Sequence, residues 1–185
     1  MTKSSFDPQG AVEFDLPRGV VRGSGDRLLV VPAGVVDDIT REAGASAAAN
    51  VARAIGAACG KRVLSRLDGV GNVLGASIES ALSHLAGELA IAGVGALSLE
   101  RWGRALVAVV DNSAISDNAC VAAVVQGAIC AATARPVACV ALVREENSVR
   151  VLVTSGAAAL RARGWLAEGV SWGDVLARLQ SRGDA

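Results

Sequence analysis

The residues best suited to chemistry in this sequence are His84 and Glu88, which lie four positions apart in the segment SIESALSHLAGELA. Residues with that spacing share one face of a helix, so the Glu88 carboxylate could orient the His84 imidazole as a base, or the two could supply two metal ligands. A metal site needs further ligands, and the sequence points to none. The sequence therefore favours an ordinary surface or half-buried pair over a catalytic or metal centre.

Four cysteines are the other candidates for chemistry, and they are Cys59, Cys120, Cys130 and Cys139. None of them forms a C-x-x-C pair, which is the spacing typical of zinc sites and of redox-active dithiols. Three of them stand in runs rich in Ala or Val, where a free cysteine behaves as a small apolar residue. The pattern predicts reduced, buried thiols in a cytoplasmic protein, and no metal site.

The stretch DGVGNVLG, residues 68–75, is predicted to be a glycine-rich loop. Its pattern is G-x-G-x-x-x-G after a helix, whereas a dinucleotide-binding loop has G-x-G-x-x-G between a strand and a helix. The sequence also lacks G-x-S-x-G, H-E-x-x-H and P-loop motifs. We therefore expect no catalytic residues, no cofactor and no enzymatic activity.

The composition narrows the classes of partner. Eighteen basic and eighteen acidic residues cancel, and no Lys or Arg cluster stands out, which argues against a nucleic-acid partner. The first 25 residues do not resemble a secretory signal, and the apolar runs are far shorter than a membrane span needs. We expect one domain in the cytoplasm, without a membrane span.

Apolar spacing and turn residues predict the secondary structure. Residues 1–25 are expected to form a flexible arm with one short strand at 12–14. The predicted elements that follow are strand 27–31, helices 32–43, 46–67 and 77–92, strands 97–99 and 105–110, helix 118–135, strands 137–143 and 149–153, and helices 157–168 and 171–180. Hairpin strands with helices stacked on one side make an α+β domain, with an antiparallel sheet of about four to five strands.

The helix predicted at 46–67 carries two glycines on one side. Each glycine costs a helix about 1 kcal/mol relative to Ala, and a helix that accepts this cost often needs the close approach of another backbone. The residues expected to form a dimer contact or a close helix contact are Val51, Ile55, Gly56, Cys59, Gly60 and Val63.

Three stretches resemble the TRAPP small-subunit fold and its bacterial and archaeal relatives, the 4-vinyl reductase or hydrocarbon-binding domains. They are the helix VARAIGAACGKRVLSRL, the strand and turn LVAVVDNSAI, and the helix VVQGAICAATA with the hairpin VACVALVREENSVRVLV. The resemblance implies a core of residues 26–155 that dimerises and has a hydrophobic pocket. Residues 156–185 are expected to be a helical extension with no counterpart in that family.

From the resemblance and the helices lined by Ala and Val, we expect a homodimeric scaffold or adaptor that holds an apolar small molecule. The residues expected to line the pocket are Leu82, Leu85, Leu89, Val121, Val125 and Ile129. A protein partner is also expected, with Trp165 and Trp172 as its candidate surface, since large rings at element ends either seal a core or bind a partner.

One alternative comes from a different functional class. The run from AIGAACGKRVLSRL through VVQGAI also resembles an accessory protein of bacterial cellulose synthase. That likeness implies an accessory assembly component of a cellulose synthase and export complex, with a role in cellulose biosynthesis.

Overall fold

A four-stranded antiparallel sheet forms the centre of the molecule. The computed structural model describes residues 5–75 and 78–181. The strands of the central sheet lie in the order β4-β5-β7-β6, with the bounds β4 Ala96–Trp102, β5 Ala105–Asp111, β6 Ala138–Glu145 and β7 Ser148–Thr154. Two hairpins build it, and Gly103 and Glu146 turn them with positive φ angles of 62° and 51°. The prediction of an α+β domain with an antiparallel sheet is confirmed.

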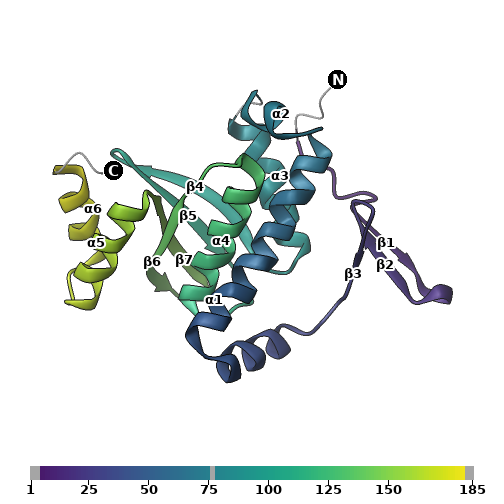
Figure 1. Ribbon diagram of the computed structural model, residues 1–185, viewed down its shortest axis with the longest axis horizontal. Helices are drawn as coiled ribbons and strands as arrows, with labels where there is room; N and C mark the ends of the chain where they lie inside the picture. The colour runs from purple at the N-terminus through teal and green to yellow at the C-terminus, as the bar shows by residue number, and fades with distance from the viewer. Residues whose placement is uncertain (1–4, 76–77, 182–185) are drawn as a thin grey trace.

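Three helices and one short helix gather on one face of this sheet (Figure 1). Their bounds are α1 Ala33–Arg66, α2 Val70–Gly75, α3 Ile78–Ile91 and α4 Asn118–Thr133. Helix α4 packs on β6 and β7, and α3 packs on β4. Helix α1 lies outside them, against α4 and α3, so the fold has a second helical layer on this face.

The C-terminal helices, α5 Gly156–Ala167 and α6 Trp172–Ser181, cover the opposite face of the sheet (Figure 1). Up to the end of β7, the helices therefore lie on a single face of the sheet, as expected. The C-terminal helices α5 and α6 cover the other face. Alternate residues of β5 pack on the two faces of the sheet. Val107 and Val109 point into the core under α5 and α6, whereas Ala108 and Val110 point into the main core.

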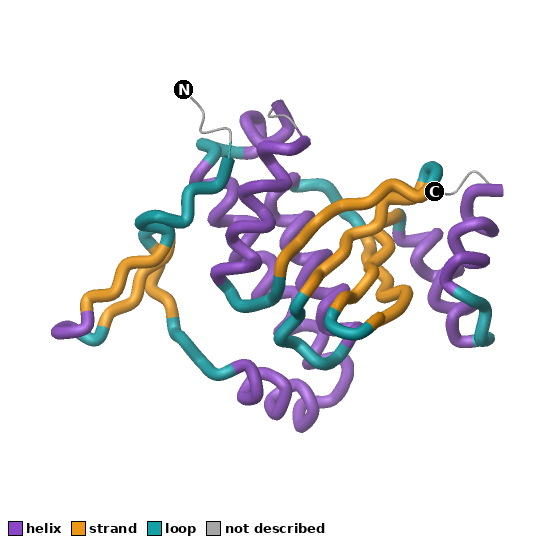
Figure 2. Tube along the Cα trace, turned by 180° about the vertical axis from the view of Figure 1, so that it is seen from behind, coloured by secondary structure: helices purple, strands orange, loops and turns teal. Residues whose placement is uncertain are grey.

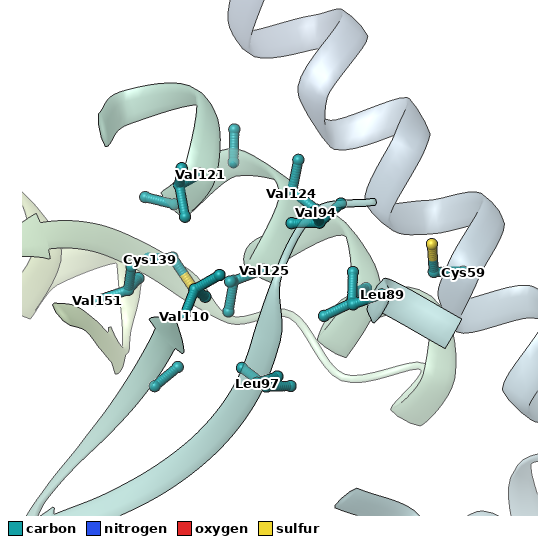
Figure 3. Close-up of a cluster of buried hydrophobic side chains, with 14 of the residues drawn as sticks. Cys59, Leu89, Val94, Leu97, Val110, Val121, Val124, Val125, Cys139 and Val151 are labelled. Carbon is teal, nitrogen blue, oxygen red and sulfur yellow. The ribbon is translucent and has the colours of Figure 1, made fainter. Parts of the chain in front are cut away.

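The main core lies between the sheet and α1, α3 and α4, as Figure 3 shows for part of it. Leu89, Val121, Val125 and Val110 meet there from two helices and a strand, and all four are buried. Small side chains dominate it, so the helices approach closely.

Helix α1 is two helices joined at Gly44, which has φ 78° and ψ 162°. The predicted stop at this glycine is confirmed, since only a residue without Cβ adopts that conformation at little cost. Helix α4 begins as predicted, with the Asp117 side chain accepting hydrogen bonds from the backbone N–H groups of Ala119 and Cys120.

Two local predictions are wrong. The loop expected at 68–75 contains α2, because Asp68 and Gly69 make the turn and the helix then buries Val73. The strand expected at 27–31 ends at Leu28, because residues 29–31 have no neighbouring strand to bind. The first residue of the helix predicted at 77–92 lies outside the described residues.

The N-terminal segment forms more structure than the single strand that we expected. Strands β1 Val12–Asp15, β2 Val20–Gly23 and β3 Asp26–Leu28 make a small antiparallel sheet, with a 3-10 turn, η1 Leu16–Arg18, between the first two. Ser24 and Gly25 turn the second hairpin with positive φ angles of 50° and 87°. Figure 2 shows this sheet standing apart from the main body, joined to α1 by an extended linker.

Candidate functional site

The His84–Glu88 helix face points inward, and both side chains are buried, so the prediction of a surface or half-buried pair is wrong. The Glu88 carboxylate accepts a hydrogen bond from Nε of Arg62 at 2.5 Å and another from Nε of Arg66 at 2.6 Å. The two arginines lie four residues apart on α1, so they present both guanidinium groups to α3. Two cations and one carboxylate leave this trio with a net charge of +1.

Burial and pairing set the protonation of this cluster. Burial is the largest single influence on the pKa of Arg62 and by itself would lower it, but the hydrogen bond to Glu88 and the electrostatic interactions with Cys59 and Glu88 together outweigh burial and raise the pKa above its ordinary value. The neighbouring Cys59 thiol also has a raised pKa, mainly because it is buried, while Arg62 opposes that shift. The cluster therefore holds charged arginines beside a neutral thiol.

The aromatic ring of Phe6 lies on this cluster. The backbone N–H of Phe6 donates to Oγ of Ser83 at 3.0 Å, which fixes the N-terminal segment on α3. Its ring lies directly on Gly87, where an added Cβ would come within 2.2 Å of the ring. Cζ of Arg66 lies 5.0 Å from the ring centroid, and the His84 ring meets it edge-on at 6.1 Å. We call this place, formed by Ser83, His84, Gly87 and Arg66, the Phe6 slot.

One hydrogen-bond donor of the Phe6 slot has no acceptor among the described residues. Nη2 of Arg66 is buried and has no hydrogen-bond partner within the described part of the chain. A buried donor without a partner costs about 1–3 kcal/mol, so such an atom is a natural place for an oxygen acceptor. The slot thus combines contacts for an aromatic ring with one unused donor.

Gly56 and Gly60 of α1 pack within the chain. A Cβ on Gly56 would lie 1.9 Å from the carbonyl oxygen of Val124, and one on Gly60 would lie 2.3 Å from that of Ala128. Both contacts are with α4, so the predicted close helix contact forms there. Of the other residues in that set, Cys59 and Val63 are buried, Ile55 is half-buried and Val51 is exposed.

The residues expected to line a pocket belong to the main core. Leu85, Leu89, Val121 and Val125 are buried in it, and Leu82 and Ile129 pack against it. An open depression of about 500 Å³ lies elsewhere, between the start of α1 and the loop before α4, and its lining is polar. Asp37, Ser116 and Asp117 are among its lining residues, so it does not match the expected apolar pocket.

The two C-terminal tryptophans pack against the second core at its rim. Trp172 meets Trp102 edge-on with ring centroids 5.2 Å apart, and the Arg150 guanidinium lies 5.8 Å from its ring. Arg178 lies 5.6 Å from the Trp165 ring. Both rings thus seal the core under α5 and α6.

Sequence reasoning found the His84–Glu88 face but missed the residues that complete it. Arg62 and Arg66 stand at helical spacing on a largely apolar segment, and two arginines facing a core predict a buried carboxylate partner. Phe6 gave no signal, because its position depends on a contact 77 residues away in the sequence.

Comparison with known proteins gives a fold relationship. No family model matches the chain, and no curated protein matches it. Among solved structures it is similar to the phenol-responsive sensory domain of the transcription activator PoxR, in a crystal structure with phenol. The TM-score is 0.59 at 13% identity, over 78% of this chain and 85% of that one. At this identity the similarity shows a shared fold, and the likenesses to TRAPP, 4-vinyl reductase and the cellulose synthase accessory protein stay predictions.

Two features of the described residues bear on other classes of site. No group of three or more His, Cys, Asp and Glu side chains is placed there to hold a metal ion. Among the same residues, no helix combines the length and the apolar character that crossing a membrane requires.

Proposed function

We propose that this chain is a non-catalytic domain that holds a small aromatic molecule, with the Phe6 slot as its binding site. The observation that carries the proposal is the Phe6 ring, which lies on a glycine with an arginine over its face and a histidine at its edge. These contacts recognise an aromatic ring whether it belongs to the chain or to a separate molecule. The fold shared with a phenol-responsive sensory domain supports the same class of ligand.

The charge of the Phe6 slot favours a ligand whose aromatic ring carries an oxygen substituent. The trio of Arg62, Arg66 and Glu88 has a net charge of +1, and Nη2 of Arg66 has no acceptor among the described residues. A phenol or benzoate oxygen at that atom would form a charge-assisted hydrogen bond, which a hydrocarbon such as toluene cannot form. The ligand is therefore an aromatic ring that carries an oxygen acceptor.

In this proposal Phe6 competes with the ligand for the slot. A bound ligand displaces the ring and breaks the hydrogen bond between the Phe6 N–H and Ser83. The affinity of the intact chain is lowered by the fraction of time that Phe6 occupies the slot. Occupancy by a ligand would thus release the N-terminal segment from α3.

Titration of the full chain with phenol, benzoate and toluene, followed by calorimetry, tests the proposal. We expect phenol or benzoate to bind more tightly than toluene, and Phe6→Ala to tighten binding by about tenfold because the competitor is gone. Phe14→Ala is the matched control, since Phe14 is the other phenylalanine of the chain and lies exposed on β1. It should leave the affinity unchanged.

Binding to the wild-type chain is the deciding measurement. The cavity that Phe6→Ala creates could bind a small aromatic molecule without any natural role. Binding should be saturable in the wild type and should speed hydrogen exchange at the Phe6 amide. Binding to Phe6→Ala alone, with none to the wild type, would contradict the proposal. So would equal affinity for toluene and phenol.

A further inference from the structure

Phe6 outlines the shape of a ligand that fits the Phe6 slot. Its phenyl ring is joined through one carbon, Cβ, to Cα, and Cα carries the backbone nitrogen. The ring lies on Gly87, and the nitrogen lies 3.0 Å from Oγ of Ser83. A ligand that takes the place of Phe6 therefore meets both contacts when its polar group stands one carbon away from its ring.

The charges around the slot favour an anion. Each carboxylate oxygen of Glu88 already accepts a hydrogen bond from one arginine, Oε2 from Arg62 and Oε1 from Arg66, and the trio keeps a net charge of +1. The Cys59 thiol does not cancel this charge, because burial raises its pKa and keeps it neutral. His84 carries no negative charge in either protonation state. Excess positive charge in an interior is stabilised by a bound negative group.

Two hydrogen-bond donors are available to the oxygens of such an anion. Nη2 of Arg66 is buried and has no acceptor among the residues that the structure describes. Oγ of Ser83 accepts from the Phe6 N–H, and once Phe6 is displaced the hydroxyl can donate instead. A carboxylate accepts from both donors with charge-assisted hydrogen bonds. A phenol offers one oxygen and, with a pKa of about 10, no charge at neutral pH.

We propose that the ligand of the Phe6 slot is an arylacetate, which is an aromatic ring joined through one carbon to a carboxylate. This inference rests on the function proposed above and narrows its ligand class. When the ring of the ligand replaces the ring of Phe6, the carboxylate carbon takes the position of Cα. One oxygen then takes the position of the backbone nitrogen, 3.0 Å from Oγ of Ser83. The bound anion brings the total charge with Arg62, Arg66 and Glu88 to zero.

Calorimetric titration of the full wild-type chain with phenylacetate, phenylacetamide, benzoate and phenylpropionate at neutral pH tests the proposal. Phenylacetate should bind most tightly. Phenylacetamide has nearly the same shape without the charge, so it should bind at least about tenfold more weakly. Benzoate and phenylpropionate keep the charge, but one carbon fewer or more moves the carboxylate by about 1.5 Å. Each should bind several-fold more weakly than phenylacetate.

Arg66→Gln and Lys61→Gln form a matched pair of variants. Both remove one positive charge from α1, but Lys61 is exposed, whereas Arg66 lies over the Phe6 ring. The measured quantity is the ratio of the affinities for phenylacetate and phenylacetamide. Arg66→Gln should bring this ratio close to one, and Lys61→Gln should keep the wild-type ratio. Glu88 remains paired with Arg62 in both variants, and circular dichroism should show unchanged folding.

The outcomes separate this inference from the proposed function. Equal affinity of the wild type for phenylacetate and phenylacetamide would overturn the inference and leave the proposed function intact. Tighter binding of phenol or benzoate than of phenylacetate would do the same, and so would an equal fall of the ratio in the two variants. If the wild type binds none of these compounds, the proposed function fails and the inference fails with it.

Discussion

The carboxylate of Glu88 binds two arginines at once, and this defines the most polar place in the interior. Buried charges are tolerated when they are paired and hydrogen-bonded, and removing one partner costs far more than the pair contributes. Glu88 forms ion pairs with both Arg62 and Arg66, and Arg66 in turn lies over the Phe6 ring. Glu88 thus positions the guanidinium that we assign to the ligand.

Cys139 makes the stability of the protein depend on pH in the alkaline range. Burial raises the pKa of this thiol from 9.0 to about 12 in the folded chain. The unfolded chain therefore loses this proton first, and the stabilisation is complete below about pH 9 and disappears as the pH rises toward 12. We expect the free energy of unfolding to fall by up to about 1.4 kcal/mol per pH unit from this group.

Urea unfolding at several values between about pH 8 and about pH 11 measures this dependence. Cys139→Ala should be less stable at neutral pH, because it leaves a small cavity, but its stability should decline less steeply with pH. Cys59 and Cys120 also have pKa values raised chiefly by burial, so part of the decline persists in the variant. Equal slopes for the wild type and Cys139→Ala would contradict the assignment.

Among the elements, α1 and α4 pack more closely than any pair of helices with larger side chains could. Gly56 and Gly60 of α1 face backbone atoms of α4, and Gly127 of α4 faces the carbonyl oxygen of Arg53, where a Cβ would lie only 2.2 Å away. Glycines on both helices thus let the backbones touch. The energetic cost of glycine in a helix is offset by this contact.

Gly56→Ala should therefore destabilise the chain by about 3 kcal/mol or more, because a methyl group cannot fit against a backbone carbonyl without separating the helices. Gly164→Ala on α5 is the control, since an added Cβ there meets no atom within 4 Å. That variant should gain up to about 1 kcal/mol from helix propensity. Thermal and urea unfolding of the two variants and the wild type provide the comparison, and equal effects would contradict the close-contact explanation.

At the scale of the whole molecule, strands β5, β6 and β7 of the central sheet are covered on both faces. The main core accounts for one face, and α5 and α6 close the other over Val107, Val140 and Leu152. Without those helices this second face would expose a row of apolar side chains to water. The C-terminal extension is therefore part of the folded domain.

Adjacent residues of α5 allow a direct test of whether α5 and α6 cover the sheet. Ala159 is fully buried against the sheet, whereas Leu160, the next residue, is 72% exposed. Ala159→Asp should displace α5 and α6, lower the stability by several kcal/mol and increase binding of a hydrophobic dye, since it buries an unpaired charge. Leu160→Asp should fold as the wild type does. Similar behaviour of the two variants would mean that the extension does not cover the sheet.

Local signals in the sequence were sufficient for most elements of the main body. The helix end before Gly44, the helix start at Asn118 and the hairpin between the strands predicted at 97–99 and 105–110 depend on neighbouring residues, and the predictions there are confirmed. The errors at 27–31 and 68–75 arose where burial decides the conformation: Leu29 has no strand to pair with, and Val73 gains a core contact that its sequence context does not reveal.

The sequence by itself determined the α+β class, the helix face that carries His84 and Glu88, and the need for a close contact at Gly56, because each follows from spacing along one element. Only the tertiary structure decided that Arg62 and Arg66 meet Glu88, and that Phe6 lies over them. These groups come from three segments far apart in the chain. Their meeting is set by how α1, α3 and the N-terminal segment pack, and no local pattern encodes it.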